Sequence, residues 1–587
     1  MLFLGVAAAQ PLELPGLAPL SPDGPDHTVV DLWRGAPGAD KVHVLVTLPD
    51  GSEELFLFDT GASISALNRD VAERLGLATR PLPGLIEGLA GAVPWEAAEI
   101  PSLRIGELEL RDVDVAVGVP GVPDAAGPLP VAGILGNNVW GNFTCVVDYP
   151  ADVLELWRPG TLKGAPKGDP MPVTELHPVV NVRLRARDGT RAAVPLQIDT
   201  GAHDVLFLGA TGEPFREAST VGVEPVLGIG ASLDELPPQS LLQTTRRVAL
   251  ATARLGGKRV RVDLSARWLG ADEQTMRSEI PGLVGYAALS KWRVILDFPE
   301  ERVALVRSRR PPRVFDAAKA WLAREVARHG DAPDRAVIRA RLHHGAGDEP
   351  AARAALDAAA AVRPDDAEIA TFRAWYLRRD GKFDEALDVL LAVPPANLAE
   401  EHAWIGVVDA LVLAGRVDEA VKRAGDALAA LDEENAEELH VALADALLAA
   451  GRPGEAAAAL DAGDGLSAHL LRRARVAYED GDRYGAIVTL RDLVALYPLD
   501  GIPLWLYATL AEPADVPTFL TDLDAALARL HPGDEPWDFV GAALIAVGQE
   551  ARGAEALRRG HARDCAPMPE SPLRANCDAW YWALAGE

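Results

Sequence analysis

The 587-residue sequence is poor in cysteine, in positive charge and in long apolar runs. Three cysteines exclude a disulfide-built fold and most cysteine-ligated metal sites. We expect no metal and no cofactor. Lys and Arg number 57 against 86 Asp and Glu, a net charge of −29, which argues against nucleic acid and anionic lipid surfaces because those partners need a basic face. No apolar run approaches the roughly 18 residues of a spanning helix, so we expect no integral membrane segment.

What is present is typical of a globular chain. Apolar residues make up 49% and charged residues 24% of the sequence, enough to fill several cores. At about 100–200 residues per domain, the length predicts about three to five domains.

The two ends of the chain bear on the compartment. Residues 1–10 form a short apolar run with three consecutive alanines, and we interpret them as a remnant of a truncated export signal or, alternatively, as an ordinary terminus. We therefore expect a periplasmic or secreted protein, with a cytoplasmic one as the alternative. Cys565 and Cys577 lie 12 residues apart; they would close a small loop in an oxidising compartment and remain thiols in a reducing one.

Composition divides the chain into three units. Residues 159–172 are rich in Gly and Pro and predict a linker, and residues 307–313 form a second, basic and proline-interrupted break. Between these breaks apolar and polar residues alternate with period two, as in Val180 to Arg187, whereas Ala and Leu at helical spacing dominate afterwards. We expect two β units at 28–158 and 173–308, and an all-α unit at 314–587.

The α unit contains a repeat. Five glycines are each followed by an alanine five residues later, with steps of 34, 34, 36 and 30 residues between the glycines: Gly347, Gly381, Gly415, Gly451 and Gly481, with Ala352, Ala386, Ala420, Ala456 and Ala486. A glycine that ends one helix and a small residue where the next helix packs closely are typical of helical hairpins. The pattern resembles tetratricopeptide (TPR) repeats; an irregular helical bundle is the alternative. The unit has no catalytic signature, and we expect it to recruit a protein partner or substrate.

The β unit is an internal duplication. An apolar strand runs into Asp59-Thr-Gly-Ala in the first copy and into Asp199-Thr-Gly-Ala in the second. Each copy later has two apolar residues and a glycine, Ile134-Leu-Gly and Leu283-Val-Gly, and an aspartate 12 residues after that glycine. One Asp-Thr-Gly is weak by itself, but two at matching places in a duplicated unit are a specific signal.

On these motifs, residues 40–308 resemble the aspartic peptidases, both the retropepsin-like bacterial proteins and the two-lobed pepsin-like enzymes. The resemblance implies two acid-protease-type β barrels in one chain, so that no homodimer is needed, and a polypeptide substrate. It implies Asp59 and Asp199 as the catalytic pair. The supporting residues of the two loops would be Thr60, Gly61, Ala62, Thr200, Gly201 and Ala202.

The chemistry explains why two acids are required. Carboxylates that share one proton cannot both ionise, so the pKa of one falls and that of the other rises, a dyad that serves as a standard example of coupled titration. The ionised member would take a proton from water while the protonated member donates to the scissile carbonyl. The residue types do not decide which aspartate plays which part.

Two glycine-rich hairpins are candidates for flaps over the substrate. The first contains Gly88, Gly91 and Trp95, and the second contains Gly228 and Gly230; ordinary hairpin turns are an equally good interpretation. His203 takes the place that Ser63 has in the first copy, where it would either perturb the dyad or bond Asp204 or the backbone.

We therefore expect an aspartic endopeptidase with a helical-repeat domain for recruitment. The rival hypothesis is a non-catalytic scaffold that binds an extended peptide in the lobes and a protein on the repeats. Retention of both aspartates favours catalysis.

Overall fold

The structure is a computed structural model of the whole chain. It describes residues 2–3, 16–36, 39–88, 91–119, 122–123, 125–225, 242–269, 281–312, 316–330, 332, 335–394, 401–429, 437–461, 467–566, 568 and 572–585. Of the features named above, Gly228, Gly230 and most of residues 1–10 lie outside these ranges.

The first lobe is a closed barrel of six strands. Its strands, in the order in which they pair around the barrel, are β7 (Gly91–Ile105), β3 (His43–Thr47), β4 (Glu53–Phe58), β11 (Gly133–Leu135), β5 (Ser65–Leu67) and β8 (Leu108–Val117). Pairing of β8 with β7 closes the ring, and β6 (Arg80–Gly88) and β1 (Leu2–Phe3) extend it beyond β7. Short helices α1 (Arg69–Arg74) and α2 (Asn137–Trp140) follow β5 and β11.

The second lobe repeats this barrel strand for strand. Its ring is β20 (Leu242–Leu255), β16 (His177–Ala186), β17 (Arg191–Ile198), β22 (Gly282–Val284), β18 (Val205–Leu208) and β21 (Lys258–Leu269). β19 (Ser219–Pro225) pairs with β20 as β6 pairs with β7. β15 (Val173–Thr174), the 3₁₀ helix η2 (Gly209–Ala218) and α4 (Tyr286–Leu289) complete the lobe. The expected internal duplication and all-β architecture are confirmed.

A six-stranded antiparallel sheet joins the two barrels. Its order is β14 (Asp169–Pro170), β24 (Arg302–Val306), β23 (Arg293–Asp297), β12 (Thr144–Asp148), β13 (Val153–Trp157) and β2 (His27–Asp31). β12 pairs with its own counterpart β23, with Val146 opposite Ile295 at the centre. We call these six strands the interlobe sheet. One apolar cluster continues from the first barrel through the interlobe sheet into the second barrel, so we treat the two lobes as one β unit.

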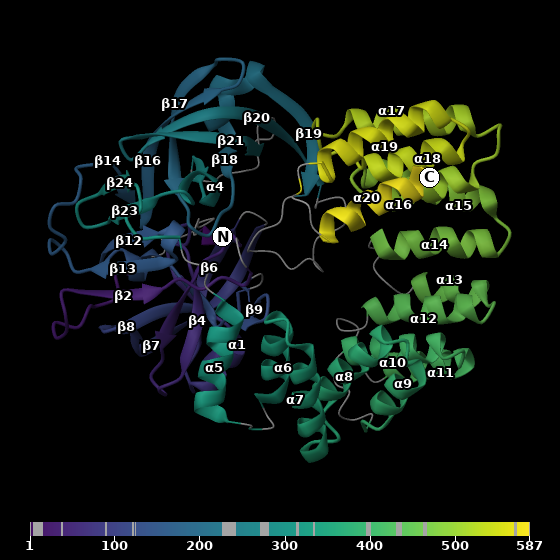
Figure 1. The fold of residues 1–587 in the computed structure, drawn as a ribbon, viewed down its shortest axis with the longest axis horizontal. Helices are drawn as coiled ribbons and strands as arrows, with labels where there is room; N and C mark the ends of the chain where they lie inside the picture. Colours follow the sequence, from purple (N-terminus) through teal and green to yellow (C-terminus); the bar gives the residue numbers. More distant parts are fainter. Residues whose placement is uncertain are drawn as a thin grey trace.

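Sixteen helices follow the β unit within the described residues. They are α5 (Ala317–His329), α6 (Ala336–Gly345), α7 (Glu349–Val362), α8 (Ala367–Arg379), α9 (Phe383–Leu391), α10 (Glu401–Leu413), α11 (Val417–Leu428), α12 (Glu437–Ala449), α13 (Pro453–Asp461), α14 (Ser467–Glu479), α15 (Arg483–Leu496), α16 (Gly501–Leu510), α17 (Val516–Ala528), α18 (Trp537–Ala546), α19 (Glu550–Asp564) and α20 (Pro572–Ala585). Successive helices pack as antiparallel hairpins that form a curved arc (Figure 1).

The glycine and alanine pattern has the structural role that the sequence predicts. The five glycines have φ between 68° and 86°, a left-handed conformation that glycine adopts without strain and that ends a helix. The five alanines are fully buried, so each lies where two helices approach closely. The TPR-like repeat domain is thereby confirmed. Gly548 (φ 76°), five residues before the buried Gly553, marks a further hairpin that the alanine pattern misses.

The arc contacts both lobes. At its start, Trp321 of α5 packs edge-on against Trp33, with ring centroids 5.6 Å apart, in a cluster with Leu55 of the first barrel. At its far end, the α17–α18 loop reaches the second barrel, where the fully buried His531 lies 2.8 Å from the Thr245 hydroxyl of β20. Figure 1 shows α17 to α20 beside β19, with the repeats passing from one lobe to the other.

Candidate active site

The two aspartates end equivalent strands. Asp59 follows β4, and its backbone N–H donates to the Leu135 carbonyl of β11 (3.2 Å); Asp199 follows β17 and donates in the same way to Val284 of β22 (3.1 Å). In both lobes these two strands run parallel. The duplicated apolar strand and the later glycine-tipped pair therefore fix the aspartate at the same place in each barrel.

The threonines tie the two loops together across the lobe interface. The Thr60 N–H donates to the Thr200 hydroxyl (3.0 Å), and the Thr200 N–H donates to the Thr60 hydroxyl (3.1 Å). Each hydroxyl in turn donates to a carbonyl of the opposite lobe, at Ile198 (2.8 Å) and Phe58 (2.7 Å). All four hydrogen bonds are buried, so they hold the loops in one geometry.

The glycines let the carboxylates approach each other. A Cβ on Gly61 would lie 2.4 Å from Oδ2 of Asp199, and a Cβ on Gly201 would lie 2.6 Å from the carboxyl of Asp59. Any side chain at either position would collide with the opposite aspartate, so the Asp-Thr-Gly spacing is a steric requirement.

One oxygen of each carboxylate is anchored and the other is not. Oδ1 of Asp59 accepts from Gly61 N–H (2.7 Å), while Oδ1 of Asp199 accepts from Gly201 N–H (2.7 Å) and Ala202 N–H (2.9 Å). Both Oδ2 atoms are buried and accept no hydrogen bond from any residue that the structure describes. The Oδ2 atoms are thus the ones available to share a proton and to meet a substrate.

Burial, followed by the negative charge of the neighbouring Asp59, raises the pKa of Asp199 to about 7. Lys41 acts against this shift because its positive charge favours the ionised carboxylate. A raised pKa on one member is what a pair of buried like charges requires.

Two side chains that sequence reasoning missed support the first loop from beneath. The amide of Asn137 donates to the Thr60 carbonyl (2.8 Å), and the amide of Gln197 donates to the carbonyls of Thr60 and Gly61 (both 3.1 Å). Gln197 also lies 2.9 Å from Nδ1 of His177, whose pKa burial lowers to about 4. The position of Asn137 directly after the Ile-Leu-Gly motif is the one sequence signal that would have found it.

The second loop is supported differently, by a cluster of charged side chains. The ammonium of Lys41 donates to the Gly201 carbonyl. His203 is half exposed, with Nδ1 3.2 Å from Asp40 and Nε2 3.8 Å from Asp204. The structure therefore pairs His203 with two carboxylates rather than directing it at the dyad.

The first flap candidate is a hairpin in the structure. Gly88 of β6 lies opposite Gly91 of β7. Trp95 is buried against Ala62 and Ile64 of the active-site loop, which places the base of this hairpin beside the dyad. Gly228 and Gly230 lie outside the described residues, between the paired strands β19 and β20.

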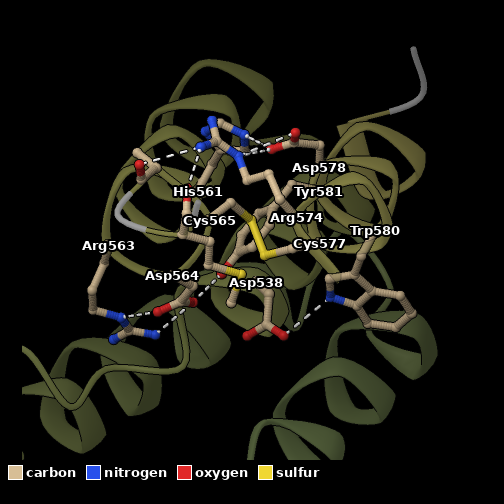
Figure 2. Close-up of a disulfide and its surroundings, with 12 residues drawn as sticks. Asp538, His561, Arg563, Asp564, Cys565, Arg574, Cys577, Asp578, Trp580 and Tyr581 are labelled. Atoms are coloured by element: carbon tan, nitrogen blue, oxygen red, sulfur yellow. Dashed lines mark hydrogen bonds and ion pairs between the residues drawn. A yellow bond between two sulfur atoms is a disulfide. The ribbon is translucent and has the colours of Figure 1, made fainter. Parts of the chain in front are cut away.

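Cys565 and Cys577 form a disulfide that links the C-terminal end of α19 to the second turn of α20, with Cα atoms 5.7 Å apart. Figure 2 shows it among charged side chains, including the pair of His561 and Asp578 (2.7 Å). His561, Cys565 and Asp578 bring potential ligand atoms within 4.8 Å of one another. Because the sulfur of Cys565 is bonded to Cys577, this group lacks the thiolate that a metal would need.

Fold and site together define the class of the N-terminal half, a two-lobed aspartic-protease fold with an Asp-Thr-Gly loop from each lobe. Residues 44–139, from β3 to α2, match the aspartyl protease family, which identifies the first lobe as aspartyl protease-like. No curated protein shows significant similarity to the chain.

Solved structures similar to the chain include TPR proteins. One from Parabacteroides merdae has 15% identity and a TM-score of 0.30, over 43% of this chain and 99% of its own. TTC0263 from Thermus thermophilus has 16% identity and a TM-score of 0.25, over 30% and 98%. YrrB, described as having an unusual peptide-binding site, has 18% identity and a TM-score of 0.26, over 31% and 94%.

Among the described residues, no helix is both long and apolar enough to cross a membrane.

Proposed function

We propose that the protein is an aspartic endopeptidase. The observation that carries the proposal is the pair of buried carboxylates, Asp59 and Asp199, which face each other across Gly61 and Gly201 in loops locked by four threonine hydrogen bonds. A binding scaffold would gain nothing from two unpartnered acid oxygens at one buried point, because desolvating them costs free energy.

The geometry supports general acid–base hydrolysis of a peptide bond. The ionised member of the dyad takes a proton from a water molecule while the oxygen of that water bonds to the carbonyl carbon. The protonated member donates its proton to the carbonyl oxygen. As the tetrahedral intermediate collapses, one of its hydroxyl groups gives its proton to the ionised member of the dyad, the protonated member donates its proton to the amine nitrogen, and the C–N bond breaks. The dyad therefore carries one proton before and after each step. The backbone N–H groups on Oδ1 hold each carboxylate in place through both steps.

The test is cleavage of a mixed peptide library between about pH 3 and 8 by wild type, Asp59→Asn and Asp199→Asn. We expect each substitution to lower kcat by at least about a thousandfold, because neither half of the dyad works alone. Asp480→Asn, at an exposed position after α14, should leave cleavage unchanged. A folded wild type that cleaves nothing in this range would favour the scaffold hypothesis instead.

For the repeats we propose a recruiting role, in which the arc binds a protein partner or part of the substrate. We also propose a periplasmic or secreted location, since the disulfide between Cys565 and Cys577 is of a kind that persists in oxidising compartments. The redox state of these two cysteines in protein isolated from the native cell under thiol-trapping conditions tests that location.

A further inference from the structure

The net charge of the chain conceals an uneven distribution. Residues 1–157 contain 22 acidic and 7 basic residues, and residues 311–587 contain 47 and 28. Residues 158–310, which include the second barrel, contain 17 acidic and 22 basic residues. The middle of the chain is therefore basic, although the protein as a whole is strongly acidic.

Some of these basic residues line a large polar cavity. The cavity has a volume of about 870 Å³ and lies against the interlobe sheet, between the linker after β13 and the segment after β24. Six basic side chains line it: Lys163, Lys258, Arg293, Arg307, Arg309 and Arg310. Among the described residues that line it, the acidic ones are Asp148 and Glu155.

The two acids of the cavity already have partners. Glu155, whose side chain is 7% exposed, forms ion pairs with Arg293 at 3.1 Å and with Arg310 at 2.9 Å. Asp148 accepts from the Ser308 hydroxyl at 2.9 Å. This arrangement shows the cavity binding a carboxylate with paired guanidinium groups, the geometry for which arginine is suited.

The remaining basic side chains are not neutralised. Within the described part of the chain, no carboxylate lies at ion-pair distance from Lys258, Arg307 or Arg309, and Lys163 donates only to the Gly160 carbonyl at 2.9 Å. In a chain with more acidic than basic residues, unpaired basic side chains around one cavity indicate an anionic ligand.

Further arginines lie on the strands of the second barrel, where the β20–β21 hairpin also carries the cavity residue Lys258. Arg254, at the end of β20, lies directly opposite Arg183 of β16 and opposite Arg259 of β21. Arg185 lies opposite Arg191 of β17. Like charges on directly opposed strand positions destabilise a sheet, and no described acid pairs with these five arginines. An anionic partner would remove that repulsion.

We propose that the cavity and these arginines form an exosite for a Glu- and Asp-rich segment of a polypeptide, through which acidic substrates are held on the catalytic unit. The proposal deepens the proposed peptidase function and rests on it. A duplex or a bilayer extends far beyond this surface and would meet the acidic first lobe and repeats, whereas a short peptide segment contacts the basic surface alone. Charge screening beyond about 8–10 Å at physiological salt makes that local attraction sufficient.

Binding is tested first, on the full-length Asp59→Asn protein, so that cleavage does not interfere. A fluorescent peptide containing eight glutamates should bind, and raising salt from 50 to 300 mM should weaken it at least tenfold. Arg307→Glu/Arg309→Glu should weaken it at least tenfold as well, whereas Arg558→Glu/Arg559→Glu, the same charge change at two exposed positions of α19, should change it less than twofold. If the two variants bind the peptide with equal affinity, or if the Asp59→Asn protein itself does not bind it, the proposal is overturned.

Two further probes distinguish other partners. A 20-nucleotide single strand and vesicles with 30% anionic lipid should bind more weakly than the peptide; tighter binding of either overturns the peptide assignment.

Cleavage then separates this proposal from the proposed function. In active protein, adding the eight-glutamate segment to a cleaved peptide should raise kcat/KM at least fivefold, and Arg307→Glu/Arg309→Glu should abolish that gain while cleavage of the plain peptide stays unchanged. Cleavage without any gain overturns the exosite and leaves the peptidase. Peptide binding without any cleavage supports the acidic-segment site and overturns the peptidase.

Discussion

At the scale of single residues, the two lobes are alike where the dyad is made and unlike where it is supported. The threonine and glycine contacts are symmetric, whereas Asn137 and Gln197 hold the first loop and Lys41 holds the second. This asymmetry gives the two aspartates different surroundings. It follows that a shared proton has unequal affinities for the two sites, which a perfectly symmetric dyad would not allow.

The raised pKa of Asp199 makes stability depend on pH. A carboxyl with a pKa of about 7 in the folded protein and about 4 in the unfolded chain favours the folded state fully below pH 4, and that contribution is lost as pH rises through 7. Asp199→Asn, which mimics the protonated acid, should therefore match wild type at pH 4 and be more stable by about 2–4 kcal/mol at pH 8. Urea unfolding at both pH values measures this, with Asp480→Asn as the control that should show no such difference.

The raised pKa of Asp199 also sets the highest pH at which the protein should remain fully active. The dyad needs one shared proton, so cleavage should fall about tenfold for each pH unit above about 7, where that proton is lost. The pH dependence of kcat/KM between pH 3 and 9 checks this. A rate that declines already above pH 5 would contradict it.

The contribution of the threonine hydrogen bonds to the free energy of unfolding can be measured by substitution. Thr200→Val removes a hydroxyl that accepts from Thr60 N–H and donates to Phe58, leaving two buried backbone groups unpaired. We expect a loss of about 2–4 kcal/mol in the free energy of unfolding. Thr200→Ser keeps both bonds and should stay within about 1 kcal/mol of wild type; equal losses in the two variants would show that packing of the methyl group, not the hydroxyl, matters.

How much of the site the sequence could predict depends on the kind of contact. Asp59 and Asp199 are predictable because a local motif occurs twice. Gln197 is not predictable as a support, because its amide reaches the Thr60 and Gly61 carbonyls of the other lobe, and no local pattern encodes that approach. The same holds for Lys41, 160 positions from Gly201 in the sequence.

At the scale of helices and strands, local chemistry explains most boundaries. Helices α5, α7, α8, α15 and α16 each begin after an aspartate whose carboxylate accepts from the backbone of the first turn, a standard helix cap. The left-handed glycines separate the hairpins. Both signals are local, and so the helical repeat was predictable. The interlobe sheet was not, because β12 pairs with β23 through residues about 150 positions apart.

The buried alanines predict sensitivity to size. Ala352 on α7 is fully buried, while Ala358 on the same helix is exposed. Ala352→Leu should cost about 1–3 kcal/mol through overpacking, and Ala358→Leu should stay within about 0.5 kcal/mol of wild type. Thermal unfolding of the two variants, followed by helical circular dichroism, compares them directly.

The disulfide should stabilise the end of the arc. It closes a loop of 12 residues between α19 and α20, which in the chain-entropy treatment stabilises by about 2–3 kcal/mol. Reductant should lower the unfolding temperature of wild type and leave a Cys577→Ser variant unaffected. A melting temperature indifferent to reductant in wild type would show that the surrounding packing is sufficient without the covalent link.

At the scale of the whole molecule, the contact between repeats and second lobe has no sequence signal. Arg247 of β20 pairs with Asp534 at 2.6 Å beside the buried His531. A Cβ on Gly222 of β19 would lie 2.6 Å from the backbone of His531, so the sheet approaches the loop closely. The partners are about 300 positions apart, and such a contact follows only from the accumulated curvature of the whole arc.

This contact should be energetically coupled. In a double-mutant cycle, Arg247→Ala and Asp534→Ala should show an interaction of about 1 kcal/mol, read from hydrogen exchange of the β19–β20 amides. Arg491→Ala, which breaks a pair with Asp522 inside the repeats, should leave those amides unchanged. Additive effects of the two substitutions would mean that the pair does not hold the strands.

Anchorage of the arc at both ends gives the protein a mechanical property. The repeats contact the first lobe at Trp321 and the second at His531, so the arc connects the two halves of the β unit (Figure 1). A force that straightens the arc or bends it further must change the distance between its contacts with the two lobes. The dyad is made of one residue from each half, and its alignment is therefore sensitive to strain in a domain that contributes no atom to it.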